Sequence, residues 1–173
     1  MLRSGGGTGA GKRTVTQQLN YAYAMLMTAH FQRYCRDLHA EAGQVLVAHL
    51  PDPALAEILE GLLAQNLRLD KGNPTPGNLG LDFARFGFRF WDAVEASDQR
   101  NKSRKTDLER LCEWRNAIVH GDIARKRAAG RLVPHNLNLD TCRGWRRALG
   151  SLAFSIDRVV SAHCKNLGCT APW

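Results

Sequence analysis

The chain has 173 residues, with 24 Lys and Arg against 16 Asp and Glu, so its formal net charge is +8. This length predicts one domain and excludes a second catalytic domain. The positive charge favours a polyanionic partner, and we expect RNA rather than a membrane surface. No stretch approaches the roughly 18 consecutive apolar residues of a membrane-spanning helix, so we expect a soluble protein.

Residues 1–14 contain five glycines among basic residues and are expected to form a flexible leader. Gly6–Lys12 matches most of a phosphate-binding loop, in which a buried strand delivers the glycine-rich turn to a helix. Here Met1–Ser4 is too short and polar to be that strand, and Arg13 stands where a hydroxyl is needed. We therefore expect no nucleotide site in this segment, and no cofactor elsewhere.

The apolar spacing of the remaining chain predicts an all-α fold, an antiparallel bundle of about five main helices. The helical domain is expected over residues 15–165, followed by a tail at 166–173. The predicted helices cover about residues 15–50, 53–69, 81–97, 107–120 and 140–165.

Several helix ends have clear signals. Pro51 ends the first predicted helix, and Thr106 or Asp107 is expected to cap the fourth and Asp140 the fifth. An aromatic stripe in the third helix, at helical spacing, is typical of a core; it contains Phe83, Phe86, Phe90 and Trp91. The loop at 70–80 has two prolines and several glycines, and is either a plain connector or one wall of a cleft.

The five cysteines are odd in number and irregular in spacing, which predicts free thiols in a reducing compartment, the cytoplasm. Cys35 and His39 lie four residues apart, but two ligands do not make a zinc site, so no metal is expected. The cysteines at helical apolar positions are expected to be core residues: Cys112, Cys142 and Cys164. The histidines at 30, 39, 49 and 163 are expected at surface or boundary positions.

The most informative segment reads Arg115-Asn116-Ala117-Ile118-Val119-His120. An arginine can hold phosphate oxygens bidentately, and a histidine can accept or donate a proton near neutral pH, so the pair suits phosphodiester cleavage. Arg115 continues an apolar stripe formed by Leu108, Leu111 and Cys112, and a charge there needs a partner. That partner is a carboxylate, with Asp37 and Glu113 as candidates, a second subunit or a ligand.

The segment from Trp114 to Asp122 resembles the signature of the HEPN superfamily (higher eukaryotes and prokaryotes nucleotide-binding), in which Arg precedes His by a few residues. The long first helix with His30–His39 and the loop Gly72–Gly80 are similar to the RiboL-PSP-like branch of small prokaryotic HEPN proteins. The resemblance spans roughly residues 18–165, and only the Trp114–Asp122 segment is specific.

This resemblance implies a homodimer whose two Arg–His pairs line one cleft, and a metal-independent endoribonuclease. His120 would be the general acid or base, and Arg115 would stabilise the charge on phosphorus as the ribose 2′-hydroxyl attacks. Asn116 would orient either the histidine or a phosphate oxygen. The products would be a 2′,3′-cyclic phosphate and a 5′-hydroxyl, and DNA would not be cut.

Asp122 stands where some HEPN toxins have a tyrosine that a partner antitoxin modifies. Neutralisation by modification of that tyrosine is therefore not supported for this chain. A toxin, an antiviral effector or an RNA-processing enzyme, with or without an antitoxin or defence partner, all remain open. The alternatives are a catalytically inactive HEPN module that binds RNA or a partner protein, an unrelated helical adaptor, and a nucleotide-binding protein using the N-terminal glycines.

Basic residues flank the motif on both sides in the sequence, and they form either a solvated helix face or an RNA-binding surface. The candidate substrate contacts among them, together with one acidic residue, are Arg85, Arg89, Lys102, Arg104, Lys105 and Asp122.

Overall fold

The computed structural model describes residues 10–169, with side chains from residue 15 onward. No β-strand occurs in that range, which confirms the all-α prediction. The elements are α1 (Ala10–Ala48), α2 (Pro53–Ala64), α3 (Arg68–Lys71), α4 (Pro76–Phe83), the 3₁₀ helix η1 (Ala84–Phe86), α5 (Phe90–Ser97), α6 (Asn101–Val119), α7 (Ile123–Ala128) and α8 (Leu139–Asn166).

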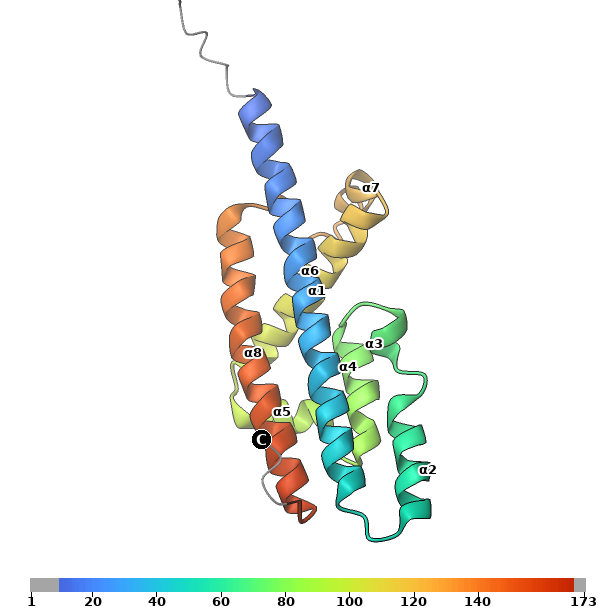
Figure 1. Ribbon diagram of the computed structural model, residues 1–173. Coiled ribbons are helices and arrows are strands. Elements are labelled where there is room, and N and C mark those ends of the chain that lie inside the picture. The colour runs from blue at the N-terminus through green and yellow to red at the C-terminus, as the bar shows by residue number, and fades with distance from the viewer. Residues whose placement is uncertain (1–9, 170–173) are drawn as a thin grey trace, which may run out of the picture.

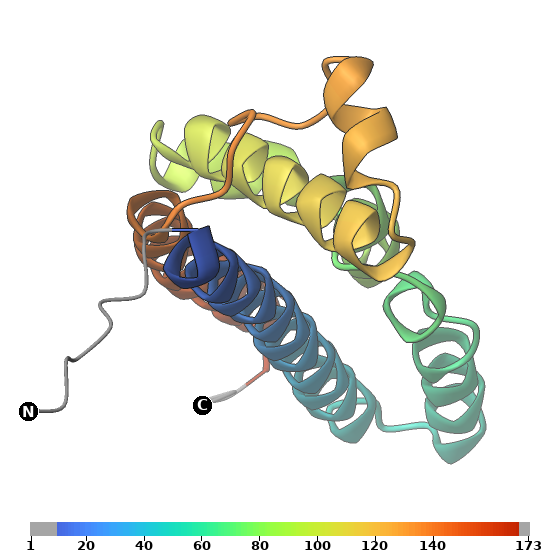
Figure 2. The same cartoon turned by 90° about the horizontal axis from the view of Figure 1, so that it is seen from above.

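The two longest helices, α1 and α8, lie side by side along most of their length (Figure 1). They run in the same direction, since Asn20 bonds to Leu137 near their starts and Tyr34 bonds to Ala153 farther along. The predicted antiparallel order is therefore wrong for this pair. The reason is that α6, α7 and the loop 130–138 lead the chain back to the end of the bundle where α1 begins (Figure 2).

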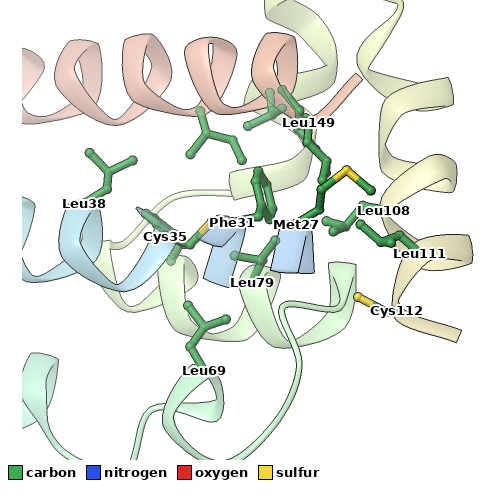
Figure 3. Packing of buried hydrophobic residues seen from close by; sticks show 14 of the residues in the cluster. Met27, Phe31, Cys35, Leu38, Leu69, Leu79, Leu108, Leu111, Cys112 and Leu149 are labelled. Atoms are coloured by element: carbon green, nitrogen blue, oxygen red, sulfur yellow. The ribbon is translucent and has the colours of Figure 1, made fainter. Parts of the chain in front are cut away.

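The core lies where α1 meets α4, α6 and α8. Met27, Phe31, Cys35 and Leu38 recur at helical spacing on α1 and are buried. Figure 3 shows these side chains directed toward residues of the other elements, which are Leu69, Leu79, Leu108, Leu111, Cys112 and Leu149. Cys112, Cys142 and Cys164 are buried as predicted, and all five cysteines are free thiols.

The aromatic segment predicted as one helix over 81–97 is divided into α4, η1 and α5. Gly87 ends η1 with φ of +84°, a left-handed conformation that glycine adopts without steric cost. Phe83, Phe86 and Phe90 are buried, so their prediction as core residues is confirmed. Because α4 already begins at Pro76, with Thr75 capping it, the predicted loop 70–80 is helical in its second half.

The fourth and fifth predicted helices begin earlier than expected. Helix α6 starts at Asn101 rather than after Thr106 or Asp107. Asn101 is fully buried and donates to the backbone oxygen of Val94 at 2.8 Å, which joins the end of α5 to the start of α6. Helix α8 is capped by Asn138, whose side chain accepts from the Thr141 amide at 2.8 Å, and not by Asp140.

Helix α2 ends at Ala64, before the predicted end near residue 69, and the short α3 follows. The fully buried Asp82 of α4 stabilises α3, because its carboxylate accepts the backbone N–H groups of Arg68 and Leu69 at 2.9 and 2.8 Å. A carboxylate at a helix N-terminus satisfies donors that the helix cannot. Asp82 thereby anchors the segment that leads into the 72–78 loop.

His39 is buried, with only 1% of its surface exposed, so the surface or boundary prediction was wrong for this residue. Its ring packs against Phe83 and Phe86, and its Nε2 lies 3.1 Å from the backbone oxygen of Asp82. Because a carbonyl only accepts, Nε2 carries the proton and donates. Burial lowers the pKa of His39, more than the nearby Asp82 backbone bond raises it.

Helix α1 begins at Ala10, so it includes the last residues of the segment expected as a leader. The glycines of the phosphate-loop-like run before Ala10 lie outside the described residues. None of the helices within residues 10–169 is long and apolar enough to cross a membrane.

Candidate functional site

The Arg–His motif occupies the last turns of α6. Trp114 and Ala117 are fully buried there, while Arg115 is half-buried and Val119 is 46% exposed. The buried stripe that includes Leu108 and Leu111 therefore continues through Trp114 and Ala117. Arg115 lies at the edge of this stripe, whereas the sequence pattern places it within the stripe.

The helix ends in a Schellman motif directly after the histidine. His120 is the C-cap, and Gly121 follows with φ of +66°. The N–H of Gly121 donates to Ile118 and that of Asp122 to Ala117, at 3.3 and 3.1 Å, which is the bonding pattern of this motif. The Gly121-Asp122 pair is thus explained by helix termination.

A polar pocket of about 470 Å³ adjoins this end of α6, and Figure 2 shows the end of α6 next to the α3–α4 segment. The pocket is formed by α1, α3, the loop before α4, the first turn of α4, and α6, which supply Gln32, Asp70, Lys71, Gly72, Asn73, Thr75, Asn78, Arg115 and Asn116. The loop predicted as either a connector or a cleft wall is therefore a wall of this pocket.

A chain of hydrogen bonds links the loop to the motif. Asn73 is 7% exposed and donates its Nδ2 to the Oδ1 of Asn116 at 2.6 Å. Arg115 donates Nη1 to the same oxygen at 3.4 Å. Behind the loop, Asn78 donates to the backbone oxygen of Asn73 at 2.7 Å, and Gln32 donates to that of Gly72 at 2.8 Å.

Neither acidic residue expected to pair with Arg115 does so. Asp37 pairs with Arg33 at 3.5 Å, and Glu113 pairs with Lys126 at 3.2 Å. Within residues 15–169, no carboxylate lies within ion-pair distance of Arg115. Because Arg115 is half-buried at the pocket edge, it keeps its charge in contact with solvent, and the expected need for an internal carboxylate does not arise.

His120 is exposed, and it does not line the pocket that contains Arg115 and Asn116. It lies one turn beyond Asn116, whose backbone oxygen accepts its N–H at 3.0 Å. Asp122 turns toward α7, where its Oδ2 accepts from Arg125 at 2.7 Å. That bond lowers the pKa of Asp122, and the nearby charges of Lys126, Arg125 and His120 lower it further.

Three of the six other predicted substrate contacts lie outside the pocket and bind neighbouring parts of the protein. Arg85 donates to three backbone oxygens at the end of α2, those of Leu62, Gln65 and Asn66. Arg104 pairs with Asp98 at 2.9 Å, and Lys105 pairs with Glu95 at 2.9 Å. Such bonds satisfy backbone oxygens and neighbouring carboxylates, so these three side chains are directed at the protein.

The remaining three candidates are also separate from the pocket. Arg89 is exposed and pairs with Asp92 at 2.7 Å, and Lys102 is exposed on the first turn of α6. Asp122, described above, is bound by Arg125. The structure therefore brings together Arg115 and Asn116 from the predicted set, with His120 nearby, and does not add the basic candidates to them.

Three amide side chains of the pocket were not predicted from the sequence: Gln32, Asn73 and Asn78. Asn73 and Asn78 stand in the proline- and glycine-rich segment already singled out, and two asparagines there were a usable signal. Gln32 gave no such signal, because it is one polar residue among many on a long helix.

The described residues contain no group of three His, Cys, Asp or Glu side chains arranged to hold a metal ion. The cysteines do not form a second reactive site either. Burial raises the pKa of the Cys112 thiol to about 12 and raises that of Cys35 still more clearly, so both thiols stay protonated and unreactive at neutral pH.

Comparisons with protein-family models, with curated proteins and with solved structures found no match for this chain. The HEPN resemblance consequently rests on the motif alone and stays a prediction.

Proposed function

We propose that this protein is an endoribonuclease that cleaves RNA through attack of the ribose 2′-hydroxyl, using Arg115, Asn116 and His120. The observation that carries the proposal is the position of Arg115, which lines a polar pocket without a carboxylate partner in the described range, one turn from an exposed histidine. Lys71 and four amide side chains also line this pocket, and its one carboxylate, Asp70, is paired with Arg36 at 2.9 Å. This balance of charge suits an anionic ligand such as a phosphate.

In the proposed reaction, the 2′-oxygen forms a bond to the adjacent phosphorus and the bond from phosphorus to the 5′-oxygen breaks. A base accepts the proton of the 2′-hydroxyl, and an acid donates a proton to the departing 5′-oxygen. Arg115 stabilises the negative charge on the non-bridging oxygens in the transition state. The products are a 2′,3′-cyclic phosphate and a 5′-hydroxyl, and DNA is not a substrate because it lacks the nucleophile.

The reaction uses one base and one acid, and each chain supplies one histidine at this site. A homodimer that brings two motifs into one cleft supplies both groups, and we include this assembly in the proposal. Its support is this need for a second proton-transfer group, together with the exposure of His120 at the end of α6.

A second candidate function is an inactive module that binds RNA or another protein. The observation that favours it is that His120 lies outside the Arg115 pocket. In that case the pocket binds a phosphate group and no bond is cleaved.

The test is incubation of the purified protein with a single-stranded RNA and a DNA of the same sequence, in EDTA, followed by analysis of the product ends. We expect wild type to cut RNA only and to leave 2′,3′-cyclic phosphates. Arg115→Ala and His120→Ala should each lower the rate by about 100-fold or more.

Two matched variants test whether losing a guanidinium or an imidazole outside the site also lowers the rate. Arg89→Ala and His30→Ala remove exposed side chains outside the pocket and should cut like wild type. Equal cleavage by all variants would contradict the proposal. RNA binding that depends on Arg115, without cleavage, would establish the inactive module.

A further inference from the structure

The Oδ1 atom of Asn116 is shared by two donors from different parts of the fold. It accepts the Asn73 amide at 2.6 Å from the loop and the Arg115 guanidinium at 3.4 Å from its own helix. We propose that Asn73 is a positioning residue for Arg115, and that it acts through Asn116. This inference rests on the proposed function for its catalytic consequence, and its structural part can be tested without activity.

The loop is well suited to hold Asn73 in place. The backbone oxygen of Asn73 accepts hydrogen bonds from Asn78 Nδ2 at 2.7 Å and from the Thr75 N–H at 2.8 Å. On the other side, Gln32 of α1 binds the backbone of Gly72, and the buried Asp82 holds the start of α3. Asn73 is itself buried, so the amide group that donates to Asn116 is held in one position.

Arg115 needs such support because an arginine side chain has many rotamers and loses about 2 kcal/mol of side-chain entropy when it is fixed. Elsewhere in the described structure, carboxylates or backbone oxygens hold arginines: Asp98 holds Arg104, and three backbone oxygens hold Arg85. A carboxylate would neutralise the charge that a phosphate needs. An amide oxygen instead orients the guanidinium and leaves its net charge for the substrate.

The same contacts restrict how Asn116 can act. Its Oδ1 is occupied by Asn73 and Arg115, so that oxygen does not bind His120. The remaining polar group of the side chain is its NH₂, which only donates. Asn116 can therefore act on the site only as a donor, either to a phosphate oxygen beside Arg115 or to the acceptor nitrogen of a neutral His120 ring.

The first measurement is a double-mutant cycle on RNA cleavage. A misplacement of about 1 Å at a reacting centre costs on the order of 100-fold in rate. We expect Asn73→Ala to lower kcat by about 10- to 100-fold, with KM changed by less than about twofold. In the Asn116→Ala background the same substitution should have no further effect, because the connection is already broken.

A residue that only stabilised the fold would lower the fraction of folded protein by the same factor in both backgrounds. Asn136→Ala, in an exposed loop outside the pocket, is the matched control and should cut like wild type. If Asn73→Ala fails to fold, Asn73→Asp replaces it, since it keeps the side-chain shape. We expect Asn73→Asp to lower kcat as well, because a carboxylate cannot donate the hydrogen bond that Asn73 Nδ2 gives to Asn116. Equal losses in both backgrounds, or wild-type kcat in the folded Asn73 variant, would overturn the inference.

The second measurement does not depend on cleavage. The NMR order parameter of the Arg115 Nε–H bond, assigned by comparison with Arg115→Lys, reports how firmly the guanidinium is held. It should fall in the Asn73 variant and in Asn116→Ala, and stay unchanged in Asn136→Ala. If wild type does not cut RNA, the proposed function fails, and this measurement alone decides the inference. An unchanged order parameter in the folded Asn73 variant would overturn it.

Discussion

Arg104 and Arg115 lie about three turns apart on α6, and the structure uses them in opposite ways. Arg104 is 13% exposed, and its guanidinium binds Asp98 at 2.9 Å and Asn101 at 2.7 Å. Arg115 is bound by the neutral Asn116 at 3.4 Å and faces a pocket. In the first half of α6, the charge of Arg104 is paired with the segment at the end of α5, whereas in the last turns the charge of Arg115 has no carboxylate partner among the described residues.

A similar contrast separates two histidines. His39 is buried at 1% exposure, packs against Phe83 and Phe86, and donates to Asp82. His120 is exposed at the end of α6, where solvent can reach it. Residue type alone therefore does not tell whether an arginine or a histidine of this chain is bound within the bundle or left exposed.

Replacing each of the two arginines by alanine gives the largest expected effects. Arg115→Ala should lower RNA cleavage by about 100-fold or more and leave the melting temperature nearly unchanged. Arg104→Ala should instead lower the melting temperature by roughly 2–6 °C, because Asp98 and Asn101 lose a partner, with cleavage per folded molecule within about twofold of wild type. Calorimetry and a cleavage assay on the same samples check both halves. If Arg115→Ala lowered the melting temperature and Arg104→Ala did not, Arg115 would be the structural arginine and Arg104 would not.

The buried histidine should make the protein sensitive to acid. The pKa of His39 in the fold lies below its ordinary value of 6.5, so at mildly acidic pH the unfolded chain binds more protons than the folded one. The contribution of His39 to the free energy of unfolding is then fully present above about pH 6.5. It falls as the pH decreases, by at most about 1.4 kcal/mol per pH unit for this one group.

Urea unfolding of wild type and His39→Gln between pH 7 and pH 5 measures this contribution. The variant should be less stable at pH 7 and should lose less stability on acidification, because glutamine can donate to Asp82 but does not titrate. His120→Gln, by contrast, should abolish cleavage without lowering stability at pH 7. An identical acid response of wild type and His39→Gln would contradict the structural role of His39.

The smallest effect is expected for Arg89, a basic residue outside both regions. It is exposed and pairs with Asp92 at 2.7 Å, and exposed pairs contribute little to stability. Arg89→Ala should change kcat/KM for RNA by less than about twofold at physiological salt, as measured by initial rates. A tenfold loss would mean that RNA extends across α5, and the pocket would then be one part of a longer binding surface.

The sequence by itself determined the helical class and most of the core. Apolar residues at helical spacing leave a chain little choice about which faces to bury, so Met27, Phe31, Leu108 and Leu111 lie inside as their periodicity predicts. Local signals also work where their physics is local. Pro53 begins α2, as the predicted helix over residues 53–69 requires, and Asp52 caps it.

Tertiary structure alone decided which polar groups are available at the site. The hydrogen bond from Asn73 to Asn116 could not be predicted, because Asn73 is distant from the motif in sequence, as is the candidate Asp37. Only the packing of α1 and the 72–78 segment against α6 shows that the amide of Asn73 reaches the motif and the carboxylate of Asp37 does not. The burial of His39 depends in the same way on α4 and η1 covering it. Periodicity reports which face of a helix is apolar, whereas the pairing of charges depends on distances between elements that the sequence does not encode locally.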